Sequence, residues 1–272
     1  MKKVLTIAGS DCSGGAGVQA DLKTFSAHGV YGMSVIAAIV AENTCRVLAV
    51  QEAAPEMIRK QMDAVFEDIE VDAVKVGMLS SPACMRAVAE GLKAYRPRHV
   101  VVDPVMYAKN GSPLMAPSAI GCLIREVLPL SEVLTPNIPE AEEITGMTIE
   151  RVSDMERAAR RIRSMGCGAV VVKGGHACGE AVDVLYDGSE FYHFTGRRIA
   201  TKNTHGTGCT FSSAIAARLA EGCGAVRAVG LAKEYVQGAI ENALSIGRGN
   251  GPTHHFYALY RAGLSKEAQH ED

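Results

Sequence analysis

The chain has 272 residues and is 47% hydrophobic, which is enough for the buried core of one large domain or two small ones. Its 28 basic and 30 acidic residues are interspersed and leave a net charge of −2, so the sequence offers no basic surface for nucleic acid or an anionic membrane. The apolar stretch at residues 4–8 is shorter than that of a signal peptide, and no segment reaches the roughly eighteen apolar residues of a membrane span, so a cytoplasmic location is expected.

Short β-branched segments alternate with amphipathic segments along most of the chain. Buried strands are predicted at residues 4–8, 74–76, 100–103, 133–135 and 169–173. Helices with one buried face, several of them opened by Ser or Pro, are predicted at residues 16–28, 55–66, 81–95, 117–128 and 153–165. Repeated strand–helix units of this kind predict an α/β fold with a doubly wound, mostly parallel sheet.

The segments at residues 182–186 and 191–194 depart from this pattern, because only the turn residues 187–190 separate them. Their spacing predicts an antiparallel hairpin at the edge of the sheet. Two long helices are predicted after it, at residues 207–220 and 225–244. No linker, repeat or shift of composition divides the chain, so one domain over residues 1–272 is expected. The 8 cysteines include no Cys-x-x-Cys pair, which argues against a zinc site and a disulfide framework.

Glycine-rich or polar segments follow several of the predicted strands. The first strand leads into a glycine loop at residues 9–17, and later strands lead into Asp103, into Asn137 and Glu140, and into Lys173. Ligands of doubly wound sheets bind at the carboxyl ends of the strands. We therefore expect these side chains to meet at one site.

A second glycine loop, residues 205–210, leads directly into the predicted helix at 207–220. The unpaired N–H groups of a helix start, together with the helix dipole, bind phosphate without a lysine. Gly206 and Gly208 allow positive φ angles and let a phosphate oxygen approach the backbone, which a Cβ would obstruct. Cys209, in the first turn, is expected to have a lowered pKa and to accept a proton from a substrate hydroxyl. The alternative is a cysteine packed in the core.

The motifs resemble those of the ribokinase-like superfamily and, within it, the hydroxymethylpyrimidine/phosphomethylpyrimidine kinases of thiamine biosynthesis. They lie in the family's order, cover nearly the full chain, and occupy residues 6–25, 75–79, 103–106, 137–140, 173–176, 205–210 and 251–256. The resemblance implies a three-layer α/β/α sandwich whose central sheet is mostly parallel, with the predicted hairpin at its edge.

The resemblance also implies ATP-dependent phosphorylation of the hydroxymethyl group of 4-amino-5-hydroxymethyl-2-methylpyrimidine, followed by a second transfer onto the monophosphate. The backbone amides of Gly206, Thr207, Gly208 and Cys209 would form an anion hole for the transferring group. Cys209, where most of the wider superfamily carries aspartate, would be the base for the hydroxyl. Because the second acceptor is already an ionised phosphate, replacing Cys209 should impair the first transfer more than the second.

The resemblance further implies an ATP site with phosphate-binding groups at Lys173, Lys109, Asn137 and Thr207. Mg²⁺ is expected near Asp103 and Glu140, held through water as is usual for this ion. Three alternatives stay open: a helix-capping role for Asn137, an ordinary surface carboxylate at Glu140, and a solvated loop lysine at Lys109.

The implied substrate pocket consists of Gly9, Asp11, Ala16, Asp21, Glu42, Met78 and Val105. The chain departs from the family at Glu42, where glutamine is common. A glutamine amide both donates and accepts, which suits a ring nitrogen beside an amino group, whereas an ionised carboxylate only accepts. Glu42 is expected either to pair with the amino group and a protonated ring nitrogen or to be protonated itself through desolvation, so binding should depend on pH.

Two other functions stay open. A pyridoxine or pyridoxal kinase of vitamin B6 salvage has the same fold and cysteine loop, although the segments at residues 41–44 and 251–256 favour the pyrimidine. A non-catalytic ligand-binding protein on the same scaffold is disfavoured, because base, anion hole and metal carboxylates are all present. A homodimer is expected by analogy with the family.

Overall fold

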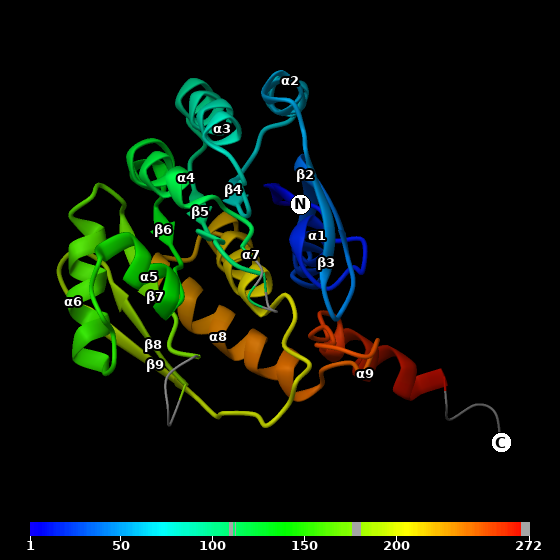
Figure 1. Cartoon of the computed structure of the whole chain (residues 1–272). Helices are drawn as coiled ribbons and strands as arrows, with labels where there is room; N and C mark the ends of the chain where they lie inside the picture. The colour runs from blue at the N-terminus through cyan, green and yellow to red at the C-terminus, as the bar shows by residue number, and fades with distance from the viewer. Residues whose placement is uncertain (109–110, 112, 176–180, 268–272) are drawn as a thin grey trace.

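The computed structural model describes residues 1–108, 111, 113–175 and 181–267 of the chain. Within those residues, nine strands form one sheet in the order β3-β2-β1-β4-β5-β6-β7-β8-β9 (Figure 1). Neighbouring strands run parallel from β2 through β7. These strands are β2 (Tyr31–Glu42), β1 (Lys3–Gly9), β4 (Ala73–Val76), β5 (Val100–Val102), β6 (Val133–Leu134) and β7 (Ala169–Val172). The predicted α/β class and its mostly parallel sheet are confirmed.

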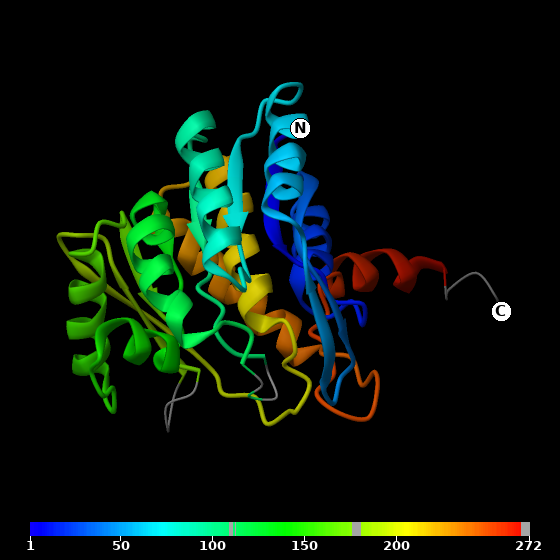
Figure 2. The ribbon, with the colours of Figure 1, turned by 45° about the horizontal axis from the view of Figure 1, so that its top comes forward.

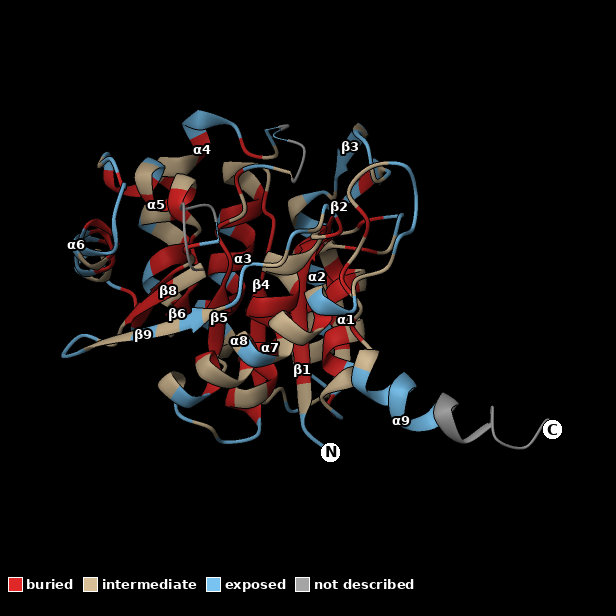
Figure 3. Ribbon diagram, turned by 90° about the horizontal axis from the view of Figure 1, so that it is seen from below, coloured by how far each residue is buried: buried red, intermediate tan, exposed pale blue. Residues whose placement is uncertain are grey.

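Helices cover both faces of the sheet (Figures 1 and 2). One face carries α2 (Pro55–Phe66), α3 (Pro82–Tyr95), α4 (Pro117–Cys122), α5 (Ile138–Thr145) and α6 (Val152–Arg163). The other face carries α1 (Gly17–Ala27), α7 (Thr207–Ala220) and α8 (Ala225–Glu241). Side chains alternate along a strand, so Leu5 packs into the first core and Val4 into the second. Burial is accordingly concentrated in the sheet and in the helix faces that touch it (Figure 3).

Both edges of the sheet are antiparallel. At one edge, β8 (Ala181–Tyr186) and β9 (Phe191–Gly196) form the predicted hairpin, and the Asp187 side chain accepts hydrogen bonds from two turn amides. At the other edge, β3 (Val47–Glu52) pairs with β2, which the sequence analysis does not anticipate. Five of the six side chains of β3 are exposed, so the alternation of buried and polar residues that signals a strand is missing there.

Three helical regions also differ from the prediction. The predicted helix at 117–128 is interrupted after α4 by a π-helical turn (Leu123–Val127) and a 3₁₀ turn (Leu128–Leu130), where Pro129 cannot donate a backbone hydrogen bond. α5 has 8 residues, too few for a clear amphipathic pattern. The C-terminal helix α9 (Tyr257–Glu267) extends away from the body of the molecule (Figure 1) and exposes Leu259 and Tyr260. Within the described residues, none of the helices has the length and apolar character needed to cross a membrane.

Candidate active site

The carboxyl ends of the parallel strands open into a cleft of about 700 Å³. Segments that follow β1, β2, β4, β5, β6 and β7 line it, together with the loop before α7. The structure brings most of the site residues expected from the sequence to this cleft, namely Gly9, Ala16, Glu42, Met78, Asp103, Val105, Asn137, Glu140, Lys173, Gly206, Thr207, Gly208 and Cys209. Asp11 and Asp21 lie behind its wall, and Lys109 lies outside the described residues.

The first turn of α7 presents backbone N–H groups to the cleft, whereas the Thr207 N–H already donates to Thr204 O (3.3 Å). Gly206 precedes the helix with φ +78°, and a Cβ there would collide with the carbonyl oxygen of Gly15. Thr210 N–H donates to Gly206 O (2.9 Å) as the first bond of the helix. The amides of Gly208 and Cys209 therefore have no acceptor within the helix and remain available to an anion.

Gly208 is needed for space and not for its backbone angle. Gly208 does not use the positive φ that glycine allows, because this residue lies in the regular first turn of α7. A Cβ at Gly208 would lie 3.3 Å from Asp103 Oδ2 and 3.4 Å from Lys173 Nζ. A side chain at this position would therefore crowd the charged pair beside the anion site. Thr207 donates its hydroxyl to the carbonyl of Thr204 (2.7 Å).

Cys209 does not have the lowered pKa expected from the helix dipole. Burial raises the pKa of its thiol to about 11, an effect that the Lys75 ammonium opposes and that Asp21 and Asp103 strengthen. The expected direction was wrong because the loss of hydration at this site outweighs the helix start. The thiol is therefore protonated at neutral pH in the ligand-free protein.

A buried ion pair lies below Cys209. Asp21 on α1 is fully buried and accepts hydrogen bonds from Lys75 Nζ (2.8 Å), Ser213 Oγ (2.7 Å) and Thr6 Oγ1 (2.6 Å). Burial disfavours the ammonium, but the charge and hydrogen bond of Asp21, together with the charge of Asp103 and the thiol group of Cys209, outweigh this effect and raise the pKa of Lys75. Lys75, which lines the cleft, is thus a fixed cation that the sequence analysis missed; its signal was a lysine inside an apolar strand.

A second ion pair lies beside the anion site. Lys173 Nζ donates to Asp103 Oδ1 (2.8 Å), and Thr135 Oγ1 donates to the same oxygen (3.1 Å). Burial opposes the charge of Lys173, but Asp103 and then Glu140 raise the pKa of this lysine. A charged ammonium is therefore held at the cleft wall next to Gly208, where phosphate groups would meet it.

Asn137 and Glu140 form the start of α5. Asn137 Oδ1 accepts from the Glu140 N–H (2.9 Å), and Glu140 Oε2 accepts from the Asn137 N–H (2.8 Å), which is a capping box. The capping alternative for Asn137 is therefore present, yet Glu140 is no surface carboxylate, since it is 3% exposed. Burial raises the pKa of Glu140 to about 7; Lys173 opposes this effect and Asp103 adds to it.

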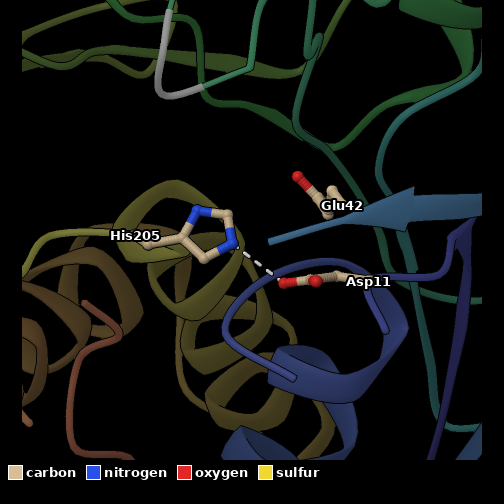
Figure 4. A group of neighbouring side chains, drawn as sticks. All are labelled: Asp11, Glu42 and His205. Atoms are coloured by element: carbon tan, nitrogen blue, oxygen red, sulfur yellow. Dashed lines mark hydrogen bonds and ion pairs between the residues drawn. The ribbon is translucent and has the colours of Figure 1, made fainter. Parts of the chain in front are cut away.

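The first glycine loop is organised around Asp11. Its carboxylate accepts hydrogen bonds from the backbone amides of Ser13 (2.7 Å), Gly15 (3.0 Å) and Ala16 (2.7 Å), and from His205 Nε2 (2.8 Å), as Figure 4 shows for the histidine. Burial acts to raise the pKa of Asp11, but these hydrogen bonds outweigh it and hold the pKa below its ordinary value. Asp11 thus shapes the loop from behind the cleft wall.

Glu42, at the end of β2, faces the cleft close to Asp11 and His205 (Figure 4). Burial raises the pKa of Glu42 to about 7; the charge of Asp11 adds to this effect and His205 opposes it. This favours the expectation that Glu42 is protonated through desolvation. Met78 packs beside it on Ala38 and Val40, and partly buried Val47, Val105 and Leu114 complete an apolar wall.

The fold is a three-layer α/β/α sandwich. One cleft in it combines helix-start amides, a buried lysine–carboxylate pair and an apolar pocket. This combination is that of the ribokinase-like phosphotransferases. The chain belongs to the phosphomethylpyrimidine kinase family, whose model matches residues 11–254. It is 51% identical to the hydroxymethylpyrimidine/phosphomethylpyrimidine kinase of Rhizobium meliloti over 94% of this chain and 98% of that protein. It is 50% identical to the thiamine biosynthesis bifunctional protein of Geobacter sulfurreducens over 94% of this chain, but spans only 52% of that longer protein.

Solved structures agree with this assignment. Phosphomethylpyrimidine kinase from Clostridium difficile 630 is 50% identical, with a TM-score of 0.78 over 87% of this chain and 98% of that chain. Pyridoxal kinase from Bacillus subtilis, in an ADP complex, is 41% identical, with a TM-score of 0.88 over 94% of this chain and 97% of that chain. The fold and the family are therefore those expected from the sequence motifs.

Proposed function

We propose that the protein transfers a phosphoryl group from ATP to 4-amino-5-hydroxymethyl-2-methylpyrimidine, and then a second one to the monophosphate, giving the diphosphate used for thiamine diphosphate. One observation carries this proposal. A single cleft holds Glu42 and an apolar wall on one side, and the free amides of the first turn of α7 with Lys173 on the other. Relatives named for this activity match nearly the whole chain.

The chemistry follows from the arrangement of charge. In each transfer the acceptor oxygen bonds to the γ-phosphorus while the bond from that phosphorus to the ADP oxygen breaks. The transition state spreads negative charge over the transferring group, so catalysis consists mainly of positioning and charge stabilisation. The amides of Gly208 and Cys209 and the ammonium of Lys173 supply donors that are already fixed before the substrate arrives.

The first transfer also requires that the hydroxyl proton leaves, and Cys209 is the base that we propose for it. Burial keeps the thiol protonated, so the reactive thiolate depends on the Lys75 ammonium, which the buried Asp21 holds in place. The first transfer should therefore accelerate as the pH rises. The second acceptor is an ionised phosphate and needs no base.

The nucleotide is proposed to bind with its phosphates at Lys173, Asn137 and Thr207, with Lys109 as a further phosphate contact. Asp103 and Glu140 fit a Mg²⁺ held through water, because both are buried carboxylates and the charge of Asp103 disfavours a charge on Glu140. Direct ligation of the ion fits less well, because Lys173 Nζ already donates to Asp103 Oδ1 and the Asn137 N–H already donates to Glu140 Oε2. When bound, the ion supplies neutralisation of the nucleotide phosphates.

ADP release with ATP and Mg²⁺ tests the proposal, with the pyrimidine, its monophosphate and pyridoxine offered in parallel and the products identified by mass. Conversion of both pyrimidines to the diphosphate is the expected result. Tight binding without ADP formation would instead indicate a ligand-binding protein.

A pyridoxine or pyridoxal kinase is the second candidate, because pyridoxal kinases are among the proteins whose structures match this chain. Turnover of pyridoxine alone in the same assay would establish it. We further propose a cytoplasmic homodimer, which light scattering of the purified protein would test.

A further inference from the structure

Residues 251–256 form one of the motif segments of the chain, yet none of them lines the cleft. The segment runs alongside the loop before α7 instead. The His205 N–H donates to Gly251 O (3.0 Å), and the Thr253 N–H donates to the His205 carbonyl (3.4 Å). The Gly251 N–H donates in turn to Asn203 Oδ1 (3.1 Å). The segment is therefore fixed to the loop that leads into the anion site.

Near its end this segment places a buried histidine against the first turn of α7. His255 is 4% exposed and Thr210 is fully buried. The hydroxyl oxygen of Thr210 lies 3.1 Å from His255 Nε2 and 2.9 Å from Gly206 O. A carbonyl cannot donate, so the hydroxyl proton goes to Gly206 O and the Nε2–H of the imidazole donates to the hydroxyl. His255 is thus linked to the Gly206 carbonyl through a single side chain.

Helix α8 holds His255 in place. Tyr235 OH donates to His255 O (2.7 Å), and the His254 N–H donates to Ala239 O (3.0 Å). α8 packs beside α7 in the second core (Figure 1). Burial lowers the pKa of His255 to about 4, and the charges of Lys23 and His254 add to this effect. The imidazole is therefore neutral at neutral pH, with its single proton on Nε2.

The Gly206 carbonyl sets the direction of the first helical turn. It accepts from the Thr210 N–H (2.9 Å) and from the Thr210 hydroxyl (2.9 Å), so two bonds from one residue fix it. A threonine in a helix divides between two χ1 rotamers. The hydrogen bond from His255 selects the rotamer whose hydroxyl reaches Gly206 O. The amides of Gly208 and Cys209 belong to the same turn, so their direction depends on that carbonyl.

We propose that His255 is a positioning residue for phosphoryl transfer. It locks the hydroxyl of Thr210 on the Gly206 carbonyl and thereby holds the amides of the first turn in the direction of the transferring group. His255 does not line the cleft, so it acts on the reaction only through α7. Small displacements matter, because a misplacement of about 1 Å costs about 10²-fold in rate. The inference rests on the proposed function and adds to it a residue outside the cleft.

Paired substitutions at His255 test the inference. His255→Leu removes the donor, whereas His255→Gln keeps an N–H within reach of Thr210. His255→Leu should lower the kcat of both transfers by about tenfold and leave the KM for the pyrimidine within about twofold, because only the phosphate side of the cleft is displaced. His255→Gln should recover most of the kcat. Equal losses in the two variants would mean that the imidazole only fills space, and this would overturn the inference.

Nucleotide affinity provides a readout that needs no acceptor. The first turn of α7 should contact the γ-phosphate, which β,γ-methylene-ATP has and ADP lacks. His255→Leu should therefore weaken calorimetric binding of β,γ-methylene-ATP by about fivefold and leave binding of ADP within about twofold. Unchanged affinity for the ATP analogue in the folded variant would overturn the inference. Absence of ADP formation from the pyrimidine in the unmodified protein would count separately, against the proposed function.

Thr210→Val is a second test that does not depend on the stability of the histidine variants. It removes the hydroxyl at nearly constant volume, so it should cause the same loss of kcat. His255→Leu added to it should cause no further loss, and losses that multiply would overturn the inference.

Thr145→Val on α5 is the matched control for Thr210→Val. Thr145 is also buried, donates its hydroxyl to the carbonyl four residues earlier (Ala141 O, 2.6 Å) and accepts from the Met147 N–H (3.2 Å). It does not line the cleft. Thr145→Val should therefore leave kcat within about twofold of the unmodified protein. A loss as large as that of Thr210→Val would show that any buried hydroxyl has this effect, and the inference would fail.

Discussion

The two glycine loops of this protein lead into helices at the same end of the sheet, where the carboxyl ends of the parallel strands lie. The loop before α7, the open loop, can bind an external anion. The loop before α1, the closed loop, cannot. The loop before α1 directs its amides at Ser13, Gly15 and Ala16 onto the carboxylate of Asp11. The loop before α7 leads into a first helical turn in which Gly208 and Cys209 line the cleft, and no side chain in the described part of the chain accepts from their amides. In both cases a glycine loop marks an anion site. What differs is whether the chain supplies the anion itself.

The largest effect is expected when the open loop is displaced. Gly206→Ala forces a Cβ against the Gly15 carbonyl at a residue with φ +78°, so the amides can no longer point at the transferring phosphoryl group. The kcat/KM of both transfers should fall by about 10²–10³-fold. Gly222→Ala is the control, because that residue has φ +96° but open space around it. Near-normal turnover in Gly206→Ala would show that the anion hole does not need this conformation.

Removing the thiol of the open loop should separate the two transfers. Cys209→Ala is expected to slow the first transfer by about 10²-fold or more and the second by much less. In the unmodified protein the first-transfer rate should rise with pH over the neutral range, because the pKa of Cys209 is raised to about 11 and the thiolate fraction grows up to that value. Single-turnover rates with each acceptor would measure both effects. Equal losses for the two acceptors would contradict the base role.

Removing the internal anion of the closed loop should act on stability. Asp11→Ala leaves buried amides and His205 without their acceptor, which should cost about 3 kcal/mol in the free energy of unfolding at pH 7. Because the pKa of Asp11 is held below its ordinary value of 3.8, its contribution is present above pH 3.8 and is lost as the pH falls below that value. Denaturant unfolding of both proteins at pH 7 and at a pH below 3.8 would measure the difference in their free energies of unfolding. A difference between variant and unmodified protein that persists undiminished in acid would argue against the ionised carboxylate.

The smallest effect is expected at the glycine of the closed loop that most resembles Gly206. Gly14 has φ +83°, but a Cβ there would meet only Lys23 Nζ, at 3.1 Å, the far end of a flexible side chain that donates to the Gly14 carbonyl (2.7 Å). Gly14→Ala should therefore cost about 1 kcal/mol of stability and leave kcat/KM within about threefold. Melting temperature and steady-state kinetics would test it beside Gly206→Ala. A loss as large as that of Gly206→Ala would erase the distinction between the two loops.

Much of the fold could be predicted because its signals are local. The buried parallel strands, most of the helices and the β8–β9 hairpin follow from apolar periodicity and turn residues, and the structure confirms them. The β2–β3 edge and α5 could not be found in this way. β3 exposes nearly all of its side chains, and α5 depends on the reciprocal bonds of Asn137 and Glu140 more than on any long pattern.

The sequence by itself determined where the polar groups gather, because strand ends and glycine loops are fixed by residues close together in the chain. Only the tertiary structure decided what those groups do. Asp11 accepts a hydrogen bond from His205, which is 194 positions away in the chain, and Lys75 forms an ion pair with Asp21. The pKa values of Cys209, Glu42 and Glu140 are all raised, with burial as the largest cause. Desolvation depends on which distant segments pack around a group, and that information is absent from the local pattern of residues.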